Sequence, residues 1–168
     1  MQVVGVSCEV TMISNQLASA IIAGVLMTHP ELPEQPLEEV LCVTEAIWFE
    51  SRGEPVAGKY AVAHVINNRV KSNRFPNTYC EVVNQPYQFS YLNDSRPTVI
   101  VNNSIDALAL EWSVKIAIDI TNQRLGSDFT FGSNHYFNPY KANPSWRHYG
   151  EEVAMVGNHL FLNQMRNR

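Results

Sequence analysis

Glu50 is the residue whose type and position best suit chemistry, because it lies where a predicted helix ends. Residues 45–56 read Glu-Ala-Ile-Trp-Phe-Glu-Ser-Arg-Gly-Glu-Pro-Val. Apolar residues recur at helical spacing before this point and predict an amphipathic helix over about 37–52. Gly53 and Pro55 predict its end. Glu50 is therefore expected in the last turn, beside the buried face of the helix.

Two features of this position disfavour the ionised form of Glu50. The negative end of the helix dipole raises the free energy of a carboxylate there. The aromatic neighbours Trp48 and Phe49 reduce its hydration. Both effects raise the pKa of the Glu50 carboxyl, as a general acid working near neutral pH requires. The alternative is a solvated glutamate at a fraying helix end, with no part in chemistry.

The composition indicates one globular domain. The chain has 168 residues, of which 45% are hydrophobic and 17% charged, and its formal net charge is −4. This length supports a single hydrophobic core, and this composition excludes a disordered chain. Scattered Lys and Arg exclude a nucleic-acid-binding surface. A mildly acidic chain gains no long-range attraction toward an anionic polymer, so local contacts must hold an anionic substrate.

The cysteine content predicts no disulfide framework. Cys8, Cys42 and Cys80 allow at most one pair to bridge. No CxxC or other metal-binding spacing occurs. The default expectation is therefore a reducing compartment, or indifference to redox conditions.

The N-terminal residues predict an apolar helix. No Asp, Glu, Lys or Arg occurs between Glu9 and Glu31, and the apolar heart at 17–27 is too short to span a bilayer. We expect a packing helix that ends near 28–30. The alternative is a weak signal-anchor, although no Lys or Arg precedes it. A membrane or protein partner is possible for residues 10–29.

The positions of the prolines divide the chain into three segments. Residues 1–29 hold the apolar helix, a proline-rich linker occupies 30–36, and the main domain is 37–168. A second helix is predicted over about 56–71, with Arg69 and Lys71 complementing its C-terminal dipole. Residues 72–103, rich in Pro, Asn and aromatics, predict a long irregular segment with short helical turns.

A third helix is predicted over about 104–124. Ser104 is the expected N-cap, and Gly126 follows the end. An apolar stripe at i, i+4 spacing is expected to face the core. It consists of Leu108, Trp112, Ile116 and Ile120.

The C-terminal part predicts a small β element. Residues 129–131 and 135–137 are typical of short strands. Residues 153–162 predict a hairpin that turns at Gly157 and Asn158. The expected fold class is mainly α (α+β), with the β element at the C-terminus.

A series of short motifs carries a resemblance to a known family. The motifs are Glu-Ser-Arg-Gly-Glu-Pro at 50–55, Ala-Val-Ala at 61–63, Asn-Arg-Val at 68–70, Phe-Pro-Asn-Thr at 75–78, Gln-Phe-Ser at 88–90, His-Tyr-Phe-Asn-Pro at 135–139, Pro-Ser-Trp at 144–146 and Gly-Asn-His-Leu-Phe at 157–161. In this order they resemble the spore-cortex-lytic (SleB-type) cell-wall hydrolase family of the lysozyme superfamily. The resemblance covers roughly residues 38–162.

The resemblance implies a goose-lysozyme-like or lytic-transglycosylase-like helical domain. It also implies cleavage of the peptidoglycan glycan strand between N-acetylmuramic acid and N-acetylglucosamine, without a cofactor. The family's catalytic acid is the first Glu of its Glu-Ala-Arg-Gly-Glu-Pro motif, which maps onto Glu50. Ser51 stands where the family usually has Ala, residues 91–103 match poorly, and residues 1–36 lie outside the resemblance.

The number of catalytic carboxylates separates two reaction routes. An inverting hydrolase needs a base about 6.5–9.5 Å from the acid. Glu54 is one candidate, although a Glu so near Arg52 is more often half of a structural ion pair. Asp94 and Asp106 are others, which sequence does not place. A lytic transglycosylase needs one carboxylate, so the lack of an obvious second favours that route.

Polar and aromatic residues in the loops are candidates for holding a sugar, since hydrogen-bonding groups beside a ring are typical of such sites. The candidate substrate-binding residues are Arg52, Glu54, Gln88, Phe89, Ser90, His135, Tyr136, Asn138, Trp146 and His159. The alternatives are structural: Phe89 as a core residue, and the later aromatics as anchors of their loop.

A metal site is not expected. His135, His148 and His159 are separated by intervals that match no usual zinc pattern, even with Glu151 and Glu152 as added ligands. A hydrogen-bonding role for His135 or His159 is the preferred interpretation. A metallopeptidase that cuts the peptide stem would rest on these histidines alone.

The residues and the resemblance together predict a peptidoglycan glycosidase of the lytic transglycosylase type, with Glu50 as general acid and then base. Arg52 and the turn at Gly53 are expected to fix the geometry around it. The alternatives are a hydrolytic muramidase of the lysozyme-type endolysin class, and a virion or wall-associated structural protein that keeps the fold. The expected place of action is the cell wall, reached by export or by phage delivery, and the compact layout suits a phage lysin.

Overall fold

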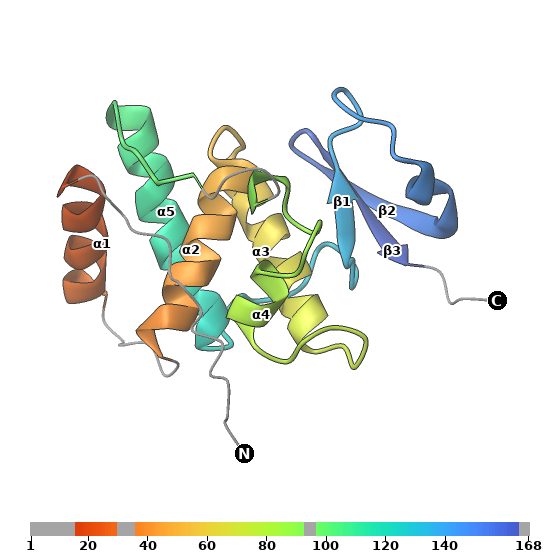
Figure 1. Cartoon of the computed structure of the whole chain (residues 1–168), viewed down its shortest axis with the longest axis horizontal. Helices are drawn as coiled ribbons and strands as arrows, with labels where there is room; N and C mark the ends of the chain where they lie inside the picture. Colours follow the sequence, from red (N-terminus) through yellow and green to blue (C-terminus); the bar gives the residue numbers. More distant parts are fainter. Residues whose placement is uncertain (1–15, 30–35, 93–96, 165–168) are drawn as a thin grey trace, which may run out of the picture.

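The computed structural model describes residues 16–29, 36–92 and 97–164. Its elements are α1 (Gln16–Thr28), α2 (Leu37–Ser51), α3 (Val56–Val70), α4 (Tyr79–Val83), the 3-10 turn η1 (Ser90–Leu92), α5 (Ser104–Thr121), β1 (His135–Phe137), the 3-10 turn η2 (Ser145–Tyr149), β2 (Gly150–Val156) and β3 (His159–Gln164). The helices form one side of the molecule and the sheet the other (Figure 1). The predicted class, mainly α with a small C-terminal β element, is confirmed.

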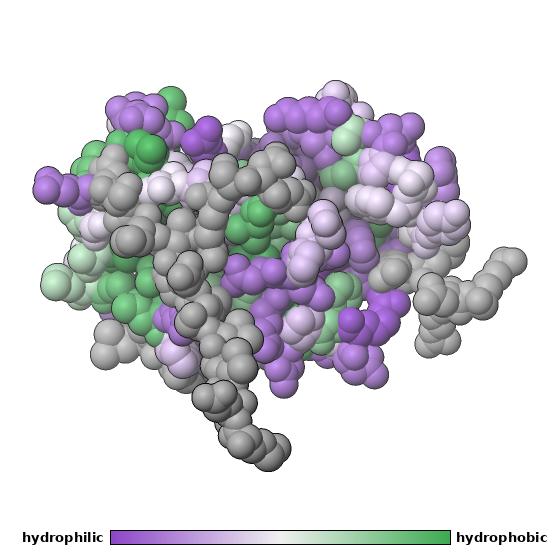
Figure 2. Space-filling view, viewed as in Figure 1, coloured by the Kyte–Doolittle hydropathy of each residue, from purple (hydrophilic) through white to green (hydrophobic). Residues whose placement is uncertain are grey.

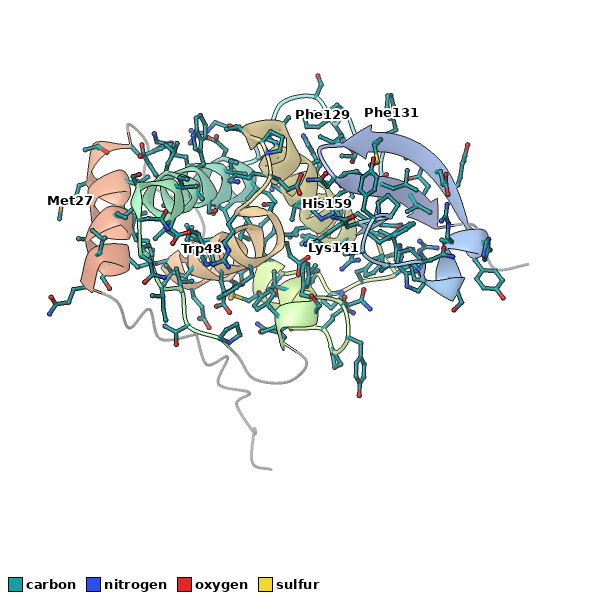
Figure 3. The ribbon with its side chains drawn as sticks, turned by 90° about the horizontal axis from the view of Figure 1, so that it is seen from above. Met27, Trp48, Phe129, Phe131, Lys141 and His159 are labelled. Carbon is teal, nitrogen blue, oxygen red and sulfur yellow. A yellow bond between two sulfur atoms is a disulfide. The ribbon has the colours of Figure 1, made fainter. Side chains whose placement is uncertain are left out.

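Helix α2 is the centre of the helical part. It packs against α3, α4 and α5, so apolar residues occur all around it rather than along one stripe. The core around it includes Val43, Ile47, Trp48, Val62, Ile66, Leu110, Val114 and Ile118, all fully buried. Seen from above, Trp48 lies among the helices (Figure 3). The last turn of α2 is therefore held on a rigid support.

Helix α1 packs on α5 through Ala18, Ile22 and Val25, which belong to the same core. Residues 16–28 are thus a helix packed on α5 in this structure, and the role of the N-terminal segment stays a prediction. No helix within the described ranges is long and apolar enough to cross a membrane. The linker at 30–35, Cys8 and the start of the predicted partner segment at 10–15 lie outside the described residues.

Apolar side chains remain on the surface beside α1 and α5, whereas hydrophilic ones cover most of the sheet side (Figure 2). The exposed apolar residues here are Leu17, Met27, Ile105 and Leu108. Met27 points away from the molecule (Figure 3). A partner for the N-terminal region stays a prediction.

Two details predicted for α5 are wrong. Asn103 caps it instead of Ser104: the Asn103 side chain accepts a hydrogen bond from the backbone N–H of Asp106 at 2.9 Å. Asn103 has the extended backbone of an N-cap, while Ser104 is already helical. In the predicted stripe, Ile116 and Ile120 are buried but Leu108 is 56% exposed. Helix α5 is covered by α1, α2 and α3, so its buried surface is wider than one stripe and shifted from the predicted one.

The sheet has the strand order β1-β3-β2 and is antiparallel. The predicted strand at 135–137 and the hairpin turning at Gly157 and Asn158 are confirmed. The predicted strand at 129–131 is wrong, because these residues form a turn. The Asp128 carboxylate accepts the backbone N–H groups of Thr130 and Gly132, both at 2.8 Å, and such a side-chain bond competes with strand pairing.

A disulfide joins Cys42 of α2 to Cys80 of α4. One pair therefore bridges, within the expected limit of at most one pair, although sequence spacing does not show which helices face each other. The Glu39 carboxylate adds a second link, accepting the backbone N–H of Tyr79 at 2.7 Å and of Cys80 at 3.2 Å. Together they tie the start of the irregular segment 72–103 to α2. That segment contains α4 and η1, as its predicted short helical turns.

Candidate active site

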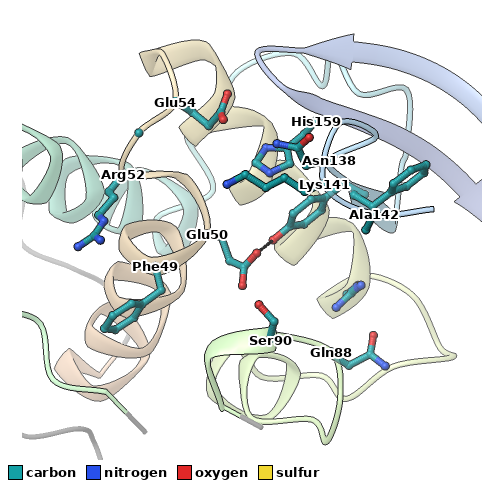
Figure 4. A pocket seen from close by; sticks show the side chains of 14 residues that line it. Phe49, Glu50, Arg52, Glu54, Gln88, Ser90, Asn138, Lys141, Ala142 and His159 are labelled. Atoms are coloured by element: carbon teal, nitrogen blue, oxygen red, sulfur yellow. Dashed lines mark hydrogen bonds between the residues drawn. The ribbon is translucent and has the colours of Figure 1, made fainter. Parts of the chain in front are cut away.

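A cleft of about 630 Å³ lies between the helices and the sheet. Its lining comes from the end of α2, from α3, from the loop at η1, from β1 and the loop after it, and from β3 (Figure 4). The residues are Phe49, Glu50, Arg52, Gly53, Glu54, Arg69, Gln88, Ser90, Tyr136, Phe137, Asn138, Lys141, Ala142 and His159. The fold thus brings five separate segments around Glu50.

Glu50 lies in the last turn of α2 and points into this cleft (Figure 4). Burial raises the pKa of its carboxyl above the usual value, which is the predicted direction. Three neighbours act against this rise: a hydrogen bond from Tyr136, the positive charge of Arg69 and the backbone N–H of Ser90. Burial is the larger effect, so the acid form of Glu50 persists to higher pH than that of an ordinary glutamate.

Tyr136, on β1, is the direct partner of Glu50. Its hydroxyl donates a hydrogen bond to Oε2 of Glu50 at 2.9 Å (Figure 4). Burial, together with the nearby Glu50 carboxylate, raises the pKa of Tyr136 well above its ordinary value. The phenol therefore keeps its proton and remains a donor. Tyr136 was predicted as a sugar-binding residue, and the structure places it on the acid itself.

Arg69, on α3, is a site residue that the sequence interpretation missed. It is buried, its Nε donates to the backbone oxygen of Asn134 at 2.8 Å, and its guanidinium lies over the rings of Phe75 and Phe89. Its Nη1 is buried without a hydrogen-bond partner in the described part of the chain. A usable signal existed: Arg69 follows Ile66 by three positions, on the buried face of α3, where an arginine needs a partner.

Arg52 was predicted to fix the geometry around Glu50, but in the structure it does not. Its side chain is exposed, lies over the Trp48 ring at 5.7 Å and points away from Glu50 (Figure 4). Lys59 of α3 holds the end of α2 instead. This lysine is 3% exposed, and its Nζ donates to the backbone oxygens of Ser51 at 2.6 Å, Arg52 at 3.2 Å and Glu54 at 2.8 Å. A cation at these carbonyls satisfies the orphan acceptors of a helix C-terminus.

Glu54 is a second carboxylate in the cleft lining, and it is already engaged. Its Oε2 accepts the backbone N–H of Asn158 at 2.9 Å, and its Oε1 accepts Nδ2 of Asn158 at 3.0 Å. Partial burial alone would raise the pKa of Glu54, but these bonds and the charges of His159 and Lys59 bring it below the usual value. The partner of Glu54 is thus Asn158 of the β2–β3 turn, through hydrogen bonds rather than the expected ion pair with Arg52, and a substrate contact of Glu54 stays a prediction.

The sequence model of the cell wall hydrolase family matches residues 53–162. The chain belongs to the cell wall hydrolase family. The matched span begins at Gly53, three residues after Glu50, and contains Arg69, Tyr136 and the rest of the sheet side of the cleft.

Curated relatives of this cell wall hydrolase are named as spore cortex-lytic enzymes. The chain is 34% identical over 123 residues to the one from Bacillus cereus, covering 73% of this chain and 43% of the relative. It is 30% identical over 125 residues to the one from Halalkalibacterium halodurans, covering 74% and 34%. The chain thus spans less than half of the length of these relatives.

Two solved structures share the fold. The catalytic domain of the Bacillus cereus SleB protein superposes with a TM-score of 0.61 at 32% identity, covering 78% of this chain and 94% of that one. The catalytic domain of a germination-specific lytic transglycosylase, SleB from Bacillus anthracis, gives 0.62 at 32% identity, with 77% and 98% covered. The resemblance stated from the motifs is therefore confirmed, and with it the lysozyme-like fold.

In this cell wall hydrolase, the predicted sugar-binding residues fall into two groups. Gln88, Ser90, Asn138 and His159 line the cleft with Glu50. Phe89 does not: it is 1% exposed and lies in the core beneath Arg69, so its prediction as a substrate contact is wrong. The ring of a Phe between two surface polar residues gains more from burial than from solvent exposure.

His135 and Trp146 form a pair beside the cleft rather than part of its lining. Their rings lie 5.5 Å apart, and Trp146 also meets the ring of Phe137 edge-on at 5.6 Å. Burial, with the charges of Arg69 and Arg74, lowers the pKa of His135 to about 4, so it is neutral at ordinary pH. The alternative role, as anchors of the loop after β1, describes this pair better than direct sugar contact.

The other candidate carboxylates lie elsewhere. Asp106 is bound to Asn103 at the start of α5, and Asp94 lies outside the described residues. Glu152 pairs with Arg147 at 2.7 Å, and His148 is exposed. Within residues 16–29, 36–92 and 97–164, no three His, Cys, Asp or Glu side chains gather where a metal ion could be held.

Proposed function

We propose that this chain cleaves the glycan strand of peptidoglycan between N-acetylmuramic acid and N-acetylglucosamine, as a lytic transglycosylase acting on the cell wall. Glu50 serves as the general acid and then as the base. The observation that carries this proposal is a carboxyl with a raised pKa that is half-buried in a cleft and accepts a hydrogen bond from a phenol. The likeness to the Bacillus anthracis catalytic domain, which is named a lytic transglycosylase, supports the same route.

In the first step, protonated Glu50 gives its proton to the glycosidic oxygen. The bond between that oxygen and C1 of the muramyl residue breaks, and the leaving N-acetylglucosamine keeps the proton as its 4-hydroxyl. The raised pKa of Glu50 keeps the proton available near neutral pH. Charge then remains on the Glu50 carboxylate, where the Tyr136 hydroxyl, the Ser90 N–H and Arg69 stabilise it.

In the second step, the Glu50 carboxylate takes the proton of the muramyl 6-hydroxyl. The oxygen of that hydroxyl attacks C1 and closes a 1,6-anhydro ring, so no water is consumed and Glu50 returns to its protonated form. If the two hydrogen bonds and the charge of Arg69 outweighed burial, the pKa of Glu50 would fall below the usual value and the ionised carboxyl would have no proton to give. Burial is the larger effect on the pKa of Glu50, so both half-reactions remain accessible.

The state of Glu54 supports the one-carboxylate route. Both of its oxygens accept hydrogen bonds from Asn158, and its lowered pKa reflects those bonds. A carboxylate used in this way anchors the β2–β3 turn. Withdrawing it to activate a water would break that anchor.

The second candidate function is a hydrolytic muramidase. It is favoured by one observation, that Glu54 lines the same cleft as Glu50. In that reaction a water activated by a base attacks C1, and the products carry reducing muramyl ends.

The deciding experiment is mass spectrometry of the soluble fragments released from purified peptidoglycan. Wild type, Glu50→Gln and Glu54→Gln are compared side by side. We expect 1,6-anhydro-muramyl ends from wild type and Glu54→Gln, and no fragments from Glu50→Gln. Reducing ends that vanish in both variants would identify the muramidase, with Glu54 as its base. Binding of wild type to the wall without any release of fragments would identify a wall-binding protein instead.

A further inference from the structure

Lys141 is a cation of the cleft that the catalytic scheme does not use. It lies in the loop after β1, is exposed, and lines the cleft opposite the end of α2. Its side chain extends from the sheet side into the cleft (Figure 4). Seen from above, Lys141 and His159 lie together between the helices and the sheet (Figure 3).

The backbone that carries Lys141 is well defined. The backbone oxygen of Asn138 accepts the N–H groups of Lys141 and Ala142, both at 3.0 Å. The Asn138 side chain accepts the N–H of Tyr140 at 2.9 Å. This is a closed turn built on Asn138, so the position from which the lysine side chain projects is fixed.

The other charges of the cleft already interact with groups of the protein. Arg52 lies over Trp48, Arg69 acts on Glu50, and Glu54 is bound to Asn158. The ammonium of Lys141 has no hydrogen-bond or ion-pair partner within the part of the chain that the structure describes. Its charge does reach the cleft, since it contributes to lowering the pKa of His159, after burial.

The cleft therefore has a charge balance opposite to that of the chain. When Glu50 is protonated, the lining holds the cations Arg52, Arg69 and Lys141 against the single carboxylate of Glu54. The whole chain carries −4. A positive cleft in an acidic protein favours an anionic ligand there, even though the molecule as a whole repels one.

We propose that Lys141 is a specificity-determining residue that binds a carboxylate carried by the muramyl residue of the glycan strand. This inference rests on the proposed function and names the feature of the substrate that the site recognises. N-acetylglucosamine is uncharged, whereas each N-acetylmuramic acid carries a lactyl ether. The carboxyl of that ether is free in peptide-free strands and linked to a stem peptide, with its own carboxylates, in the intact wall. An ammonium on a defined turn distinguishes these two sugars by charge.

The test measures binding of three soluble glycan strands to proteins that also carry Glu50→Gln, so that nothing is cleaved during titration. The strands carry either stem peptides, free lactyl carboxylates, or lactyl carboxyls converted to neutral methylamides. With Lys141 present, we expect carboxylate strands to bind about fivefold more tightly than methylamide strands, the size of a solvent-accessible ion pair. Lys141→Met should remove this difference, and Lys141→Arg should keep it.

The matched control is Lys115→Met, which makes the same change of net charge on α5. Lys115 pairs with Glu111 at 2.6 Å and is not part of the cleft lining. This variant should keep the full preference for carboxylate strands. Loss of the preference there as well would mean that net charge, rather than Lys141, sets it.

The remaining outcomes also decide the matter. If the affinity for either carboxylate strand depends on Lys141, the inference is supported. The strand whose affinity changes shows whether the lactyl or the stem-peptide carboxylate is bound. A preference that survives Lys141→Met overturns it, as does an equal loss of affinity for charged and neutral strands. Because binding is measured without turnover, failure of wild type to cleave any strand would count against the proposed function alone.

Discussion

Two glutamates from the same short stretch of chain line the cleft, and their carboxyls behave in opposite ways. Glu50, in the last turn of α2, has a raised pKa. Glu54, in the turn four residues later, has a lowered one. Both side chains line the same cleft. Both residues are glutamates and lie four positions apart, so their pKa values differ because the fold places different groups against each carboxyl.

Burial is the largest single effect on the pKa of both carboxyls, but at Glu54 the two hydrogen bonds from Asn158 and the charges of His159 and Lys59 together outweigh it. The Glu50 carboxyl meets a phenol hydroxyl, one backbone N–H and a buried arginine, and desolvation still outweighs them. Glu54 is less buried and meets two donors of Asn158 in good geometry. One carboxyl is thus prepared to exchange a proton, and the other is kept as a fixed anion that holds a turn.

The strongest test of this contrast replaces each glutamate by glutamine. Glu50→Gln should lower the rate of glycan cleavage by about a thousandfold, the contribution expected of a general acid. Glu54→Gln should lower it by less than about tenfold, because the amide still accepts a hydrogen bond from Asn158. Initial rates of fragment release, with folding checked by circular dichroism, measure both. Equal losses would end the distinction between the two carboxyls.

Tyr136→Phe should change the pH dependence as well as the rate. Removing the hydroxyl takes a donor away from the Glu50 carboxylate, so the pKa of Glu50 rises further. The acid form then persists to higher pH, and the upper limb of the kcat/KM profile should move up by about one pH unit. A profile that stays in place or moves to lower pH would show that Tyr136 does not act on the acid.

Lys59→Met tests the hydrogen bonds that hold the backbone between Glu50 and Glu54. It leaves the carbonyls of Ser51 and Glu54 without their buried donor, at a cost of about 2 kcal/mol in the free energy of unfolding. Below the unfolding transition, kcat should fall while KM changes little, because Glu50 loses its fixed position. Urea denaturation and steady-state kinetics give the two numbers. Arg124→Met, on an exposed residue beyond α5, is the matched cationic control.

Asn158→Ala should produce the smallest effect on stability, because it changes only the surroundings of the Glu54 carboxylate. Losing the side-chain donor raises the pKa of Glu54 toward its usual value. A carboxyl whose pKa is depressed in the folded state contributes stability above its unfolded pKa, and this is lost as pH falls through the folded pKa. The variant should therefore be about 0.5 kcal/mol less stable at neutral pH, after allowance for solvent screening, with the difference vanishing in acid. Unfolding followed at several pH values checks the sign.

Predictions based on local sequence succeeded where local forces decide the outcome. Helices α2, α3 and α5 and the hairpin at Gly157 follow from periodicity and turn residues, each acting over a few positions. The errors occurred where a competing bond or a neighbouring element decided. Asp128 converted the predicted strand at 129–131 into a turn, and the core took Phe89 that had been predicted to face the substrate.

Local sequence was enough to place Glu50 at the end of a helix, before a glycine and a proline, in a motif order typical of the cell wall hydrolase family. Which groups contact that carboxyl depends on how the elements pack. Tyr136 lies 86 positions away along the chain, and Arg69, Lys59 and Lys141 take their roles from where their elements pack. The physical reason is range: backbone preferences act over a few residues, whereas burial, hydrogen bonding and charge act between whatever the fold brings within a few ångströms.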